Sequence, residues 1–176
     1  MRLFSNIRLN SLEDLLVLEL EDLYDGEKRV CDLLPKMAEA ATAPGLRRAF
    51  LDHLQQTKGQ LARLEQMFAD LGRQPSGETC DAMKGLIKES EDIISATGNP
   101  HVKDAALISA AQRIEHYEIS GYGTARSYAE HLGRTSISRL LPATLDEEAE
   151  TDQQLTHLAE LSINVKAEYS HIGETI

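Results

Sequence analysis

Several features typical of secreted, membrane-bound or nucleic-acid-binding proteins are missing from this sequence. It has only two cysteines, Cys31 and Cys80, whose positions fit neither a disulfide framework nor a metal-binding motif. Lysine and arginine number 18 against 29 acidic residues, the net charge is -11, and no stretch of sequence gathers the basic residues into a phosphate-binding surface. Nucleic acid and anionic membranes are therefore not expected as partners.

The N-terminal stretch also lacks a long hydrophobic run. The segment MRLFSNIRLNSLEDLL has no uninterrupted apolar core and reaches an acidic residue at Glu13. We therefore expect neither a signal peptide nor a membrane span, and we expect a cytoplasmic protein.

Strand patterns are absent too, because no β-branched alternation of any length occurs, whereas apolar residues recur every three or four positions along almost the whole chain. This periodicity predicts an all-α protein. Glycine and proline clusters divide it into helices expected at residues 11–41, 46–71, 78–96, 101–132 and 136–165, with a loop at 72–77 and a tail at 167–176.

The lengths of the connections predict how the helices are arranged. Three-residue breaks at 43–45 and 133–135 force antiparallel hairpins. The third helix, of about 19 residues, spans roughly 28 Å and can return along the outside of a bundle. We therefore expect one domain over residues 1–176, with its core at about 10–166: a ferritin-like four-helix bundle with a long helical crossover.

Acidic residues interrupt the apolar stripes of three helices near their midpoints. They are Glu27 in the first helix, Glu115 and Glu118 in the fourth, and Glu148 and Asp152 in the fifth. Any single one could lie at the edge of its stripe with its carboxylate in water, which is the commoner situation. In a bundle, however, all of them reach the same level, and five facing carboxylates cannot all stay ionised in a low-dielectric interior.

Metal ions are the simplest neutraliser of such a cluster, since no lysine or arginine lies on these stripes at that level. Two divalent ions would contribute four positive charges, and carboxylates together with an imidazole suit iron or manganese. The second helix supplies His53, Gln56 and Gln60 along one flank of its stripe. The spacing of Glu115 and Glu118, three residues apart, suits two metals held a few ångströms apart.

Other polar residues are weaker candidates. His116 points about 100° away from its neighbour Glu115 and is expected at the surface. Tyr122 and Tyr24 each lie near a stripe acid and could hydrogen-bond a ligand or act in redox chemistry, although a buried tyrosine with a satisfied hydroxyl is the commoner case. A shift in helix phase would replace Glu148 by Glu147. The remaining off-stripe histidines are His131, His157 and His171.

Four segments carry a family resemblance over about residues 10–162: YDGEKRVCDLLPKMA, LDHLQQTKGQLARLEQMF, DAALISAAQRIEHYEISGYGTARSYAEHLG and LLPATLDEEAETDQQLTHLA. They resemble the YciE/YciF-like family of ferritin-like proteins. The resemblance implies a small homodimeric bundle with a dimetal centre, made by bacteria in stress responses. The ligands it implies are Glu27, His53, Glu115, Glu118, Glu148 and Asp152.

This chain departs from the ferritin-like pattern in two helices. The second offers His53 and Gln56, where members of the family commonly carry Glu at the latter position, and the last long helix has no histidine in register. Gln56 could coordinate only as a neutral donor, so one metal position is expected to be weaker.

Two functions remain open on this basis. One is a redox metalloprotein that oxidises iron or consumes peroxide at a carboxylate-bridged di-iron centre. The other is a non-enzymatic dimeric scaffold whose metal site is structural or vestigial, which Gln56 favours. A DNA-protecting miniferritin is disfavoured by the net charge and by the lack of a basic tail.

Overall fold

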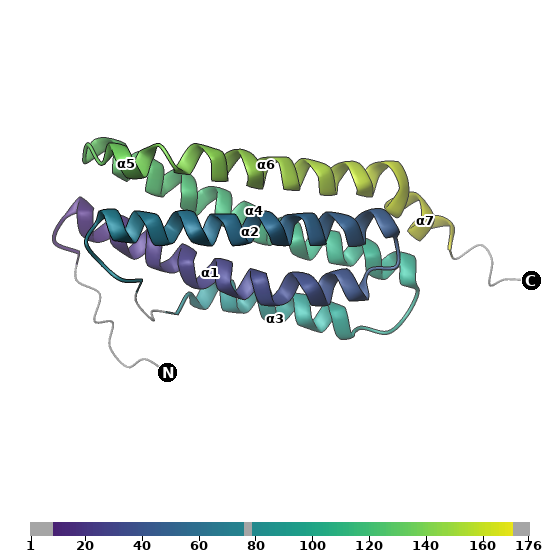
Figure 1. Ribbon diagram of the computed structural model, residues 1–176. Helices are drawn as coiled ribbons and strands as arrows, with labels where there is room; N and C mark the ends of the chain where they lie inside the picture. Colours follow the sequence, from purple (N-terminus) through teal and green to yellow (C-terminus); the bar gives the residue numbers. More distant parts are fainter. Residues whose placement is uncertain (1–8, 76–78, 171–176) are drawn as a thin grey trace, which may run out of the picture.

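The protein is built from helices throughout residues 9–75 and 79–170, which are the residues that the computed structural model describes (Figure 1). The elements are α1 (Leu12–Ala40), α2 (Pro44–Asp70), α3 (Asp81–Ser95), α4 (Pro100–His131), α5 (Thr135–Ser138), α6 (Leu141–Leu158), the π-helical turn η1 (Ala159–Ile163) and α7 (Asn164–Tyr169). This confirms the predicted all-α class. No helix in the described part of the chain is long and apolar enough to cross a membrane.

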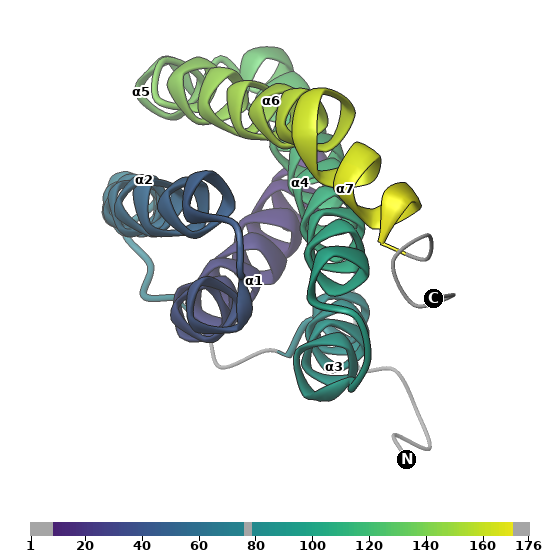
Figure 2. The same ribbon diagram turned by 90° about the vertical axis from the view of Figure 1, so that its right-hand side faces the viewer.

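Helices α1, α2, α6 and α4 form the four sides of a bundle (Figure 2). Helices α1 and α2 make one antiparallel hairpin and α4 and α6 the other, while α2 and α4 run in the same direction (Figure 1). Helix α3 travels back along the outside and packs against both α1 and α4. The crossover arrangement predicted from the connection lengths is therefore present.

The last long helix is not continuous as predicted. It is divided into α5 and α6 at residues 139–140, just before Pro142 in the first turn of α6. A proline lacks the backbone N–H and its ring clashes with the carbonyl four residues earlier, here that of Ser138, where α5 ends. At the other end the chain stays helical to Tyr169, so the predicted tail begins too early, and residues 171–176 lie outside the described part.

The core consists of two apolar clusters separated by a polar layer. The first cluster includes Val30, Leu34, Phe50, Leu54, Ile114 and Leu155. The second includes Leu20, Leu23, Leu64, Tyr122 and Leu141. In each bundle helix, the residues between the two clusters include buried polar side chains: Glu27, Thr57, Gln60, Glu115, Glu118, Glu148 and Thr151. Four of the five stripe-interrupting acids, Glu27, Glu115, Glu118 and Glu148, thus meet at one level, whereas Asp152 does not join them.

The crossover helix packs on its own chain. Its Ile87, Ile93 and Ile94 are half-buried against the first apolar cluster. The homodimer itself stays a prediction.

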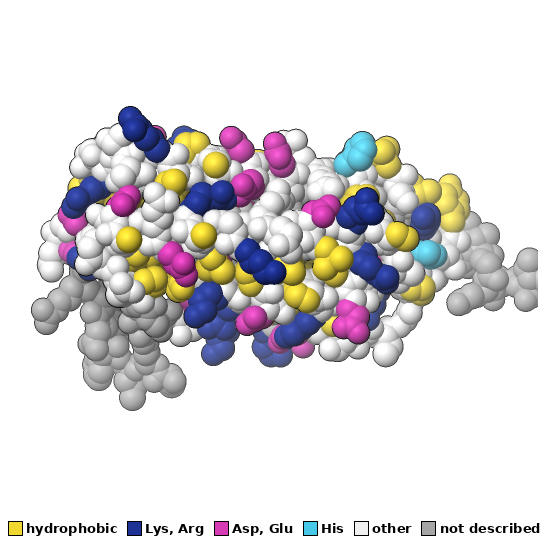
Figure 3. Space-filling view, viewed as in Figure 1, with side chains coloured by type: hydrophobic (Ala, Val, Ile, Leu, Met, Phe, Trp, Pro, Cys, Tyr) yellow, Lys and Arg dark blue, Asp and Glu magenta, His cyan; other side chains and the backbone are white. Residues whose placement is uncertain are grey.

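A groove of about 390 Å³ lies between α1 and α3, where basic side chains gather along one edge of the molecule (Figure 3). Its lining comprises Arg29, Asp32, Leu33, Lys36, Lys84, Ile87, Lys88 and Glu91. The basic residues come from two helices far apart in sequence, so no linear stretch predicts this grouping. The groove does not include the polar layer.

Asp104 of α4 fixes the turn between α1 and α2. Its carboxylate is 1% exposed and accepts the backbone N–H groups of Thr42 and Ala43, each at 2.8 Å. These donors lie in the turn immediately before α2, which begins at Pro44. Asp104 therefore holds the α1–α2 turn from the other hairpin.

We expect Asp104→Ala to lower the free energy of unfolding by about 1–3 kcal/mol, because two part-buried N–H groups lose their acceptor. Urea denaturation followed by circular dichroism measures this difference. The exposed Asp146→Ala is the matched control and should change stability by less than about 0.5 kcal/mol. Equal stability of the two variants would contradict the role of Asp104 in holding the turn.

Candidate metal centre

Four carboxylates and one imidazole meet in the polar layer at the middle of the bundle. Glu27 comes from α1, His53 from α2, Glu115 and Glu118 from α4, and Glu148 from α6. All five side chains are 2% exposed or less. Glu148, and not Glu147, occupies the buried position on α6, which settles the helix phase that the sequence left open.

The donor atoms of this group lie close together. His53, Glu115, Glu118 and Glu148 each offer one ligand atom, and these atoms lie within 4.8 Å of one another. His53 Nε2 is 3.3 Å from Glu115 Oε1. Seven buried side-chain atoms at this level have no hydrogen-bond partner: Glu27 Oε2, His53 Nε2, Gln60 Oε1, Glu115 Oε2, both oxygens of Glu118, and Glu148 Oε2. Buried polar atoms without partners are rare in native structures, and so many in one place indicate a ligand.

Burial makes the ionised forms of these acids unfavourable. It raises the pKa of Glu27 from 4.5 to about 8, with a further contribution from the charge of Glu148. Burial likewise raises the pKa of Glu115 to about 8. The pKa values of Glu118 and Glu148 are also raised well above 4.5, by burial first and by neighbouring carboxylates second.

Tyr122 supports Glu27 from within the core. Its side chain is fully buried, and its hydroxyl donates a hydrogen bond of 2.5 Å to Glu27 Oε1, which lowers the pKa of Glu27 against the effect of burial. Tyr122 is therefore a core residue with a satisfied hydroxyl, and the group that satisfies it is a candidate ligand. The sequence analysis raised both the buried tyrosine and the hydrogen bond to a ligand. Tyr24 lies elsewhere and donates to the exposed Glu65.

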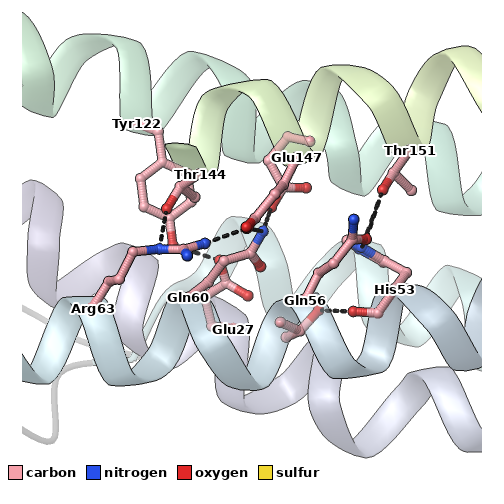
Figure 4. A network of polar contacts seen from close by, with 11 residues as sticks. Glu27, His53, Gln56, Gln60, Arg63, Tyr122, Thr144, Glu147 and Thr151 are labelled. Carbon is pink, nitrogen blue, oxygen red and sulfur yellow. Dashed lines mark hydrogen bonds and ion pairs between the residues drawn. The ribbon is translucent and has the colours of Figure 1, made fainter. Parts of the chain in front are cut away.

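The contacts of Nδ1 orient the imidazole ring of His53. Nδ1 lies 3.3 Å from Thr151 Oγ1 and 3.4 Å from Gln56 Oε1, which leaves Nε2 facing the carboxylates (Figure 4). Thr151 also donates to Gln56 Oε1 at 3.3 Å. Gln56 is thus a partner of His53 on the side away from the carboxylates, which is the usual role of the groups behind a metal-binding histidine.

Gln60 is the amide that enters the polar layer, although the sequence analysis placed it on the flank of the stripe and did not include it among the ligands. It is fully buried, and its Nε2 donates to the carboxylate of Glu148 and, at 3.2 Å, to Glu147 Oε2. Its Oε1 has no partner. Gln60 follows His53 by seven residues, two helical turns, and this spacing on the same face is the signal that could have identified it.

Arg63 closes the outer side of this layer between α2 and α6 (Figure 4). Its Nε donates to Thr144 Oγ1 at 2.9 Å, and its guanidinium forms an ion pair with Glu147. No lysine or arginine lies on the apolar stripes at this level, but Arg63 still reaches the edge of the layer. Arg63 comes from beside the stripe, and its long side chain reaches back along α2 to the centre's edge.

Asp152 lies apart from the buried donors. It is 21% exposed, lies 3.4 Å from the Nε2 of His116, and accepts a hydrogen bond of 2.9 Å from Gln112. Its charge nevertheless contributes to the raised pKa of Glu115. His116 is 70% exposed, as predicted for a surface histidine, and His131 and His157 are exposed too, whereas His171 lies outside the described residues.

The donor set fits divalent metal ions with a preference for oxygen and imidazole ligands. The four central carboxylates together carry four negative charges when ionised, with one neutral imidazole beside them. Metal ions would satisfy the charges and the unpaired atoms together.

Because the raised pKa values belong to the folded state, the metal-free protein should become less stable as the pH rises. Between about pH 4.5 and pH 8 the folded state binds protons on Glu27 and Glu115 that the unfolded state has released. The stabilisation from these protons is complete below about pH 4.5 and is lost as the pH passes about 8. Thermal unfolding of chelator-treated protein across this range measures the slope, and Glu115→Gln should flatten it. A melting temperature that rises with pH would contradict the assignment.

Tyr122→Phe should weaken metal binding about 10–100-fold, because Glu27 loses the donor that orients it. Competition with a chelator of known affinity measures the dissociation constant. The control is Tyr24→Phe, whose hydroxyl bonds an exposed carboxylate and whose loss should leave the affinity unchanged. Equal affinities for the two variants would show that Tyr122 has no part in ligand positioning.

Comparison with known proteins places the chain in a family. Residues 11–168 match the family described as "Domain of unknown function (DUF892)". Protein YciF of Escherichia coli strain K12 is 41% identical over 163 residues, which covers 92% of this chain and 98% of that protein. The crystal structure of the E. coli stress protein YciF superposes with a TM-score of 0.85 over 89% of this chain and 99% of that one.

A second solved structure, of the protein YcfI from Rhodopseudomonas palustris, is 40% identical and has a TM-score of 0.82, covering 87% of this chain and 98% of its own. The family match spans nearly the whole bundle, and both solved relatives keep about two-fifths of its residues. The chain therefore belongs to the DUF892 family of YciF-like proteins, as the resemblance in its sequence indicates.

Proposed function

We propose that this protein binds two divalent metal ions, iron foremost and manganese or another divalent metal as substitutes, in the polar layer of the bundle. The observation that carries the proposal is the set of seven buried donor atoms without partners, contributed by all four bundle helices. Two divalent ions carry four positive charges, which equals the negative charge of the four central carboxylates when they are ionised.

The residues divide into two groups around such a pair of ions. His53, Glu115, Glu118 and Glu148 would hold the first ion, since their ligand atoms already lie within 4.8 Å of one another. Glu27 would hold the second, with Gln60 Oε1 as a neutral donor. Glu118 is the candidate to bridge the ions, because neither of its oxygens has a partner.

Bound iron would supply the capacity to give electrons to dioxygen or peroxide, so iron oxidation or peroxide consumption is the proposed activity. The chain's own contribution is to hold the ligands and exclude water, since every central acid is 1% exposed or less. Tyr122 holds Glu27 through its hydroxyl proton. The E. coli relative YciF is described as a stress protein, and a role in bacterial stress response is proposed here on that basis.

A structural role for the metal is the second candidate function. The amide of α2 that reaches the centre is Gln60, and Gln56 lies behind His53, so α2 offers glutamines, which are weaker ligands than carboxylates. A centre of this kind would stabilise the fold when loaded and carry out no turnover.

Metal analysis by mass spectrometry, on protein purified without chelator, tests the proposal. We expect about two iron or manganese ions per chain in the wild type, because two divalent ions neutralise four carboxylates. The Glu115→Ala, Glu118→Ala double variant should lose them. Glu150→Gln changes one exposed acid of α6 and is the matched control.

Activity then separates the two candidate functions. Ferrous loading under anaerobic conditions, followed by addition of dioxygen or peroxide, should consume the oxidant in the wild type and not in the double variant. Bound metal without oxidant consumption would favour the structural role. A wild-type protein that takes up no metal after anaerobic reconstitution would overturn both.

A further inference from the structure

The contact between α2 and α6 differs from the other contacts around the centre because its middle is polar. We call this contact the α2–α6 seam, meaning the facing side chains His53, Gln56, Gln60 and Arg63 of α2 and Thr144, Glu147, Glu148 and Thr151 of α6 (Figure 4). Hydrogen bonds cross it at each level, from Arg63 with Thr144 to Thr151 with Gln56. The seam runs from partly exposed to fully buried groups.

The other directions around the centre are less open to a cation. Along the bundle axis the two apolar clusters lie above and below the polar layer. Opposite the seam, α3 packs over α1 and α4 (Figure 2). A hydrated ion that crossed apolar side chains would lose its water without compensating ligands, at a cost of several kcal/mol.

A second polar contact joins α4 to α6 around Asp152, with Gln112 and His116. Within the described residues, no hydrogen bond connects this group to a central carboxylate. In the seam, by contrast, Gln60 Nε2 bonds the partly exposed Glu147 and the buried Glu148 at the same time. Of these two polar contacts, the seam is the one whose hydrogen bonds, among the described residues, connect a partly exposed carboxylate to a buried central one.

We propose that divalent cations reach the centre through the α2–α6 seam, with Glu147 as the outer ligand that first takes the ion and Gln60 as the group that passes it inward. This inference rests on the proposed metal function. Glu147 is 27% exposed, whereas Glu148, next to it in sequence, is fully buried, so the two carboxylates stand at the two ends of a short path. The amide of Gln60 lies between these two carboxylates, and its Oε1, buried and without a partner, is free to act as a neutral ligand when the ion displaces the bonds of Nε2.

Arg63 closes the outer end of this path. Its guanidinium pairs with Glu147 and its Nε holds Thr144, and the side chain is 22% exposed at the outer end of the seam. An arriving cation competes with the guanidinium for Glu147 and displaces it. Once the ion has moved to the central carboxylates, the pair reforms and closes the seam behind it.

The rate of metal loading tests the path separately from the ability to bind metal. Chelator-stripped protein is mixed with Co²⁺ in a stopped-flow instrument, and the visible absorbance of the bound ion reports uptake. Glu147→Gln should load about 10-fold more slowly, the lower end of the range for electrostatic guidance of ions. Its final Co²⁺ content should equal that of the wild type.

Arg63→Gln should have the opposite effect on rate, loading Co²⁺ several-fold faster and releasing it several-fold faster to EDTA. Glu150→Gln removes the same charge from the exposed side of α6 and should load at the wild-type rate. Asp152→Asn reports on the competing contact between α4 and α6.

The proposal would be overturned if Glu147→Gln took up Co²⁺ at the wild-type rate, or if Asp152→Asn alone took it up more slowly. A lower final Co²⁺ content in Glu147→Gln would also overturn it, because Glu147 would then be a permanent ligand. A wild-type protein that takes up no Co²⁺ at equilibrium would overturn the metal function as well. Normal content with unaltered rates in both seam variants would overturn the path alone.

Discussion

The burial of four carboxylates in one layer of the bundle is the constraint on which the rest of this structure depends. Each bundle helix interrupts its apolar stripe there, so the core is split into two clusters that must stabilise the fold independently of the layer between them. Burial raises the pKa values of all four acids, which means that the ionised layer opposes folding unless something neutralises it. The four acids lie in one layer, so their destabilising effect is confined to that layer of the bundle.

The groups around the layer reduce that cost only in part. Tyr122 satisfies one oxygen of Glu27, and Gln60 donates to Glu148, but both are neutral donors. Arg63, a cation of the described chain that reaches the edge of the layer, is paired with Glu147. The protein therefore supplies orientation for the buried acids while leaving most of their charge uncompensated, which is the pattern expected of a site prepared for positively charged ligands.

The sequence was sufficient for the fold because its signals there are local and repetitive. Helical periodicity located the helices, and the long connection between α2 and α4 required the crossover. The same periodicity put Glu27, Glu115, Glu118 and Glu148 at one level, since the position of a side chain on a straight helix follows from its spacing alone. The division of the last helix at Pro142 was missed because a proline is also accepted in the first turn of a helix.

Where the prediction failed, the deciding factor was a contact between helices. Gln56 and Gln60 are one turn apart on α2, and only the position of α6 determines that Gln60 enters the layer while Gln56 stays behind His53. Asp152 follows Glu148 by one turn, yet the approach of α4 engages it with Gln112 and His116. Asp104 and Arg63 act across helices that are distant in sequence, which no stripe analysis can detect.

Helix α3 ties the two hairpins of the bundle together along one edge only. It packs on α1 and α4, and on the same edge Tyr117 of α4 donates to Asp22 of α1, and Asp104 holds the α1–α2 turn. The α2–α6 edge has no covering helix within the described chain. The two hairpins are thus held by a covering helix at the α1–α4 edge and by side-chain contacts at the α2–α6 edge, so a small rotation of one hairpin against the other would separate α2 from α6 first.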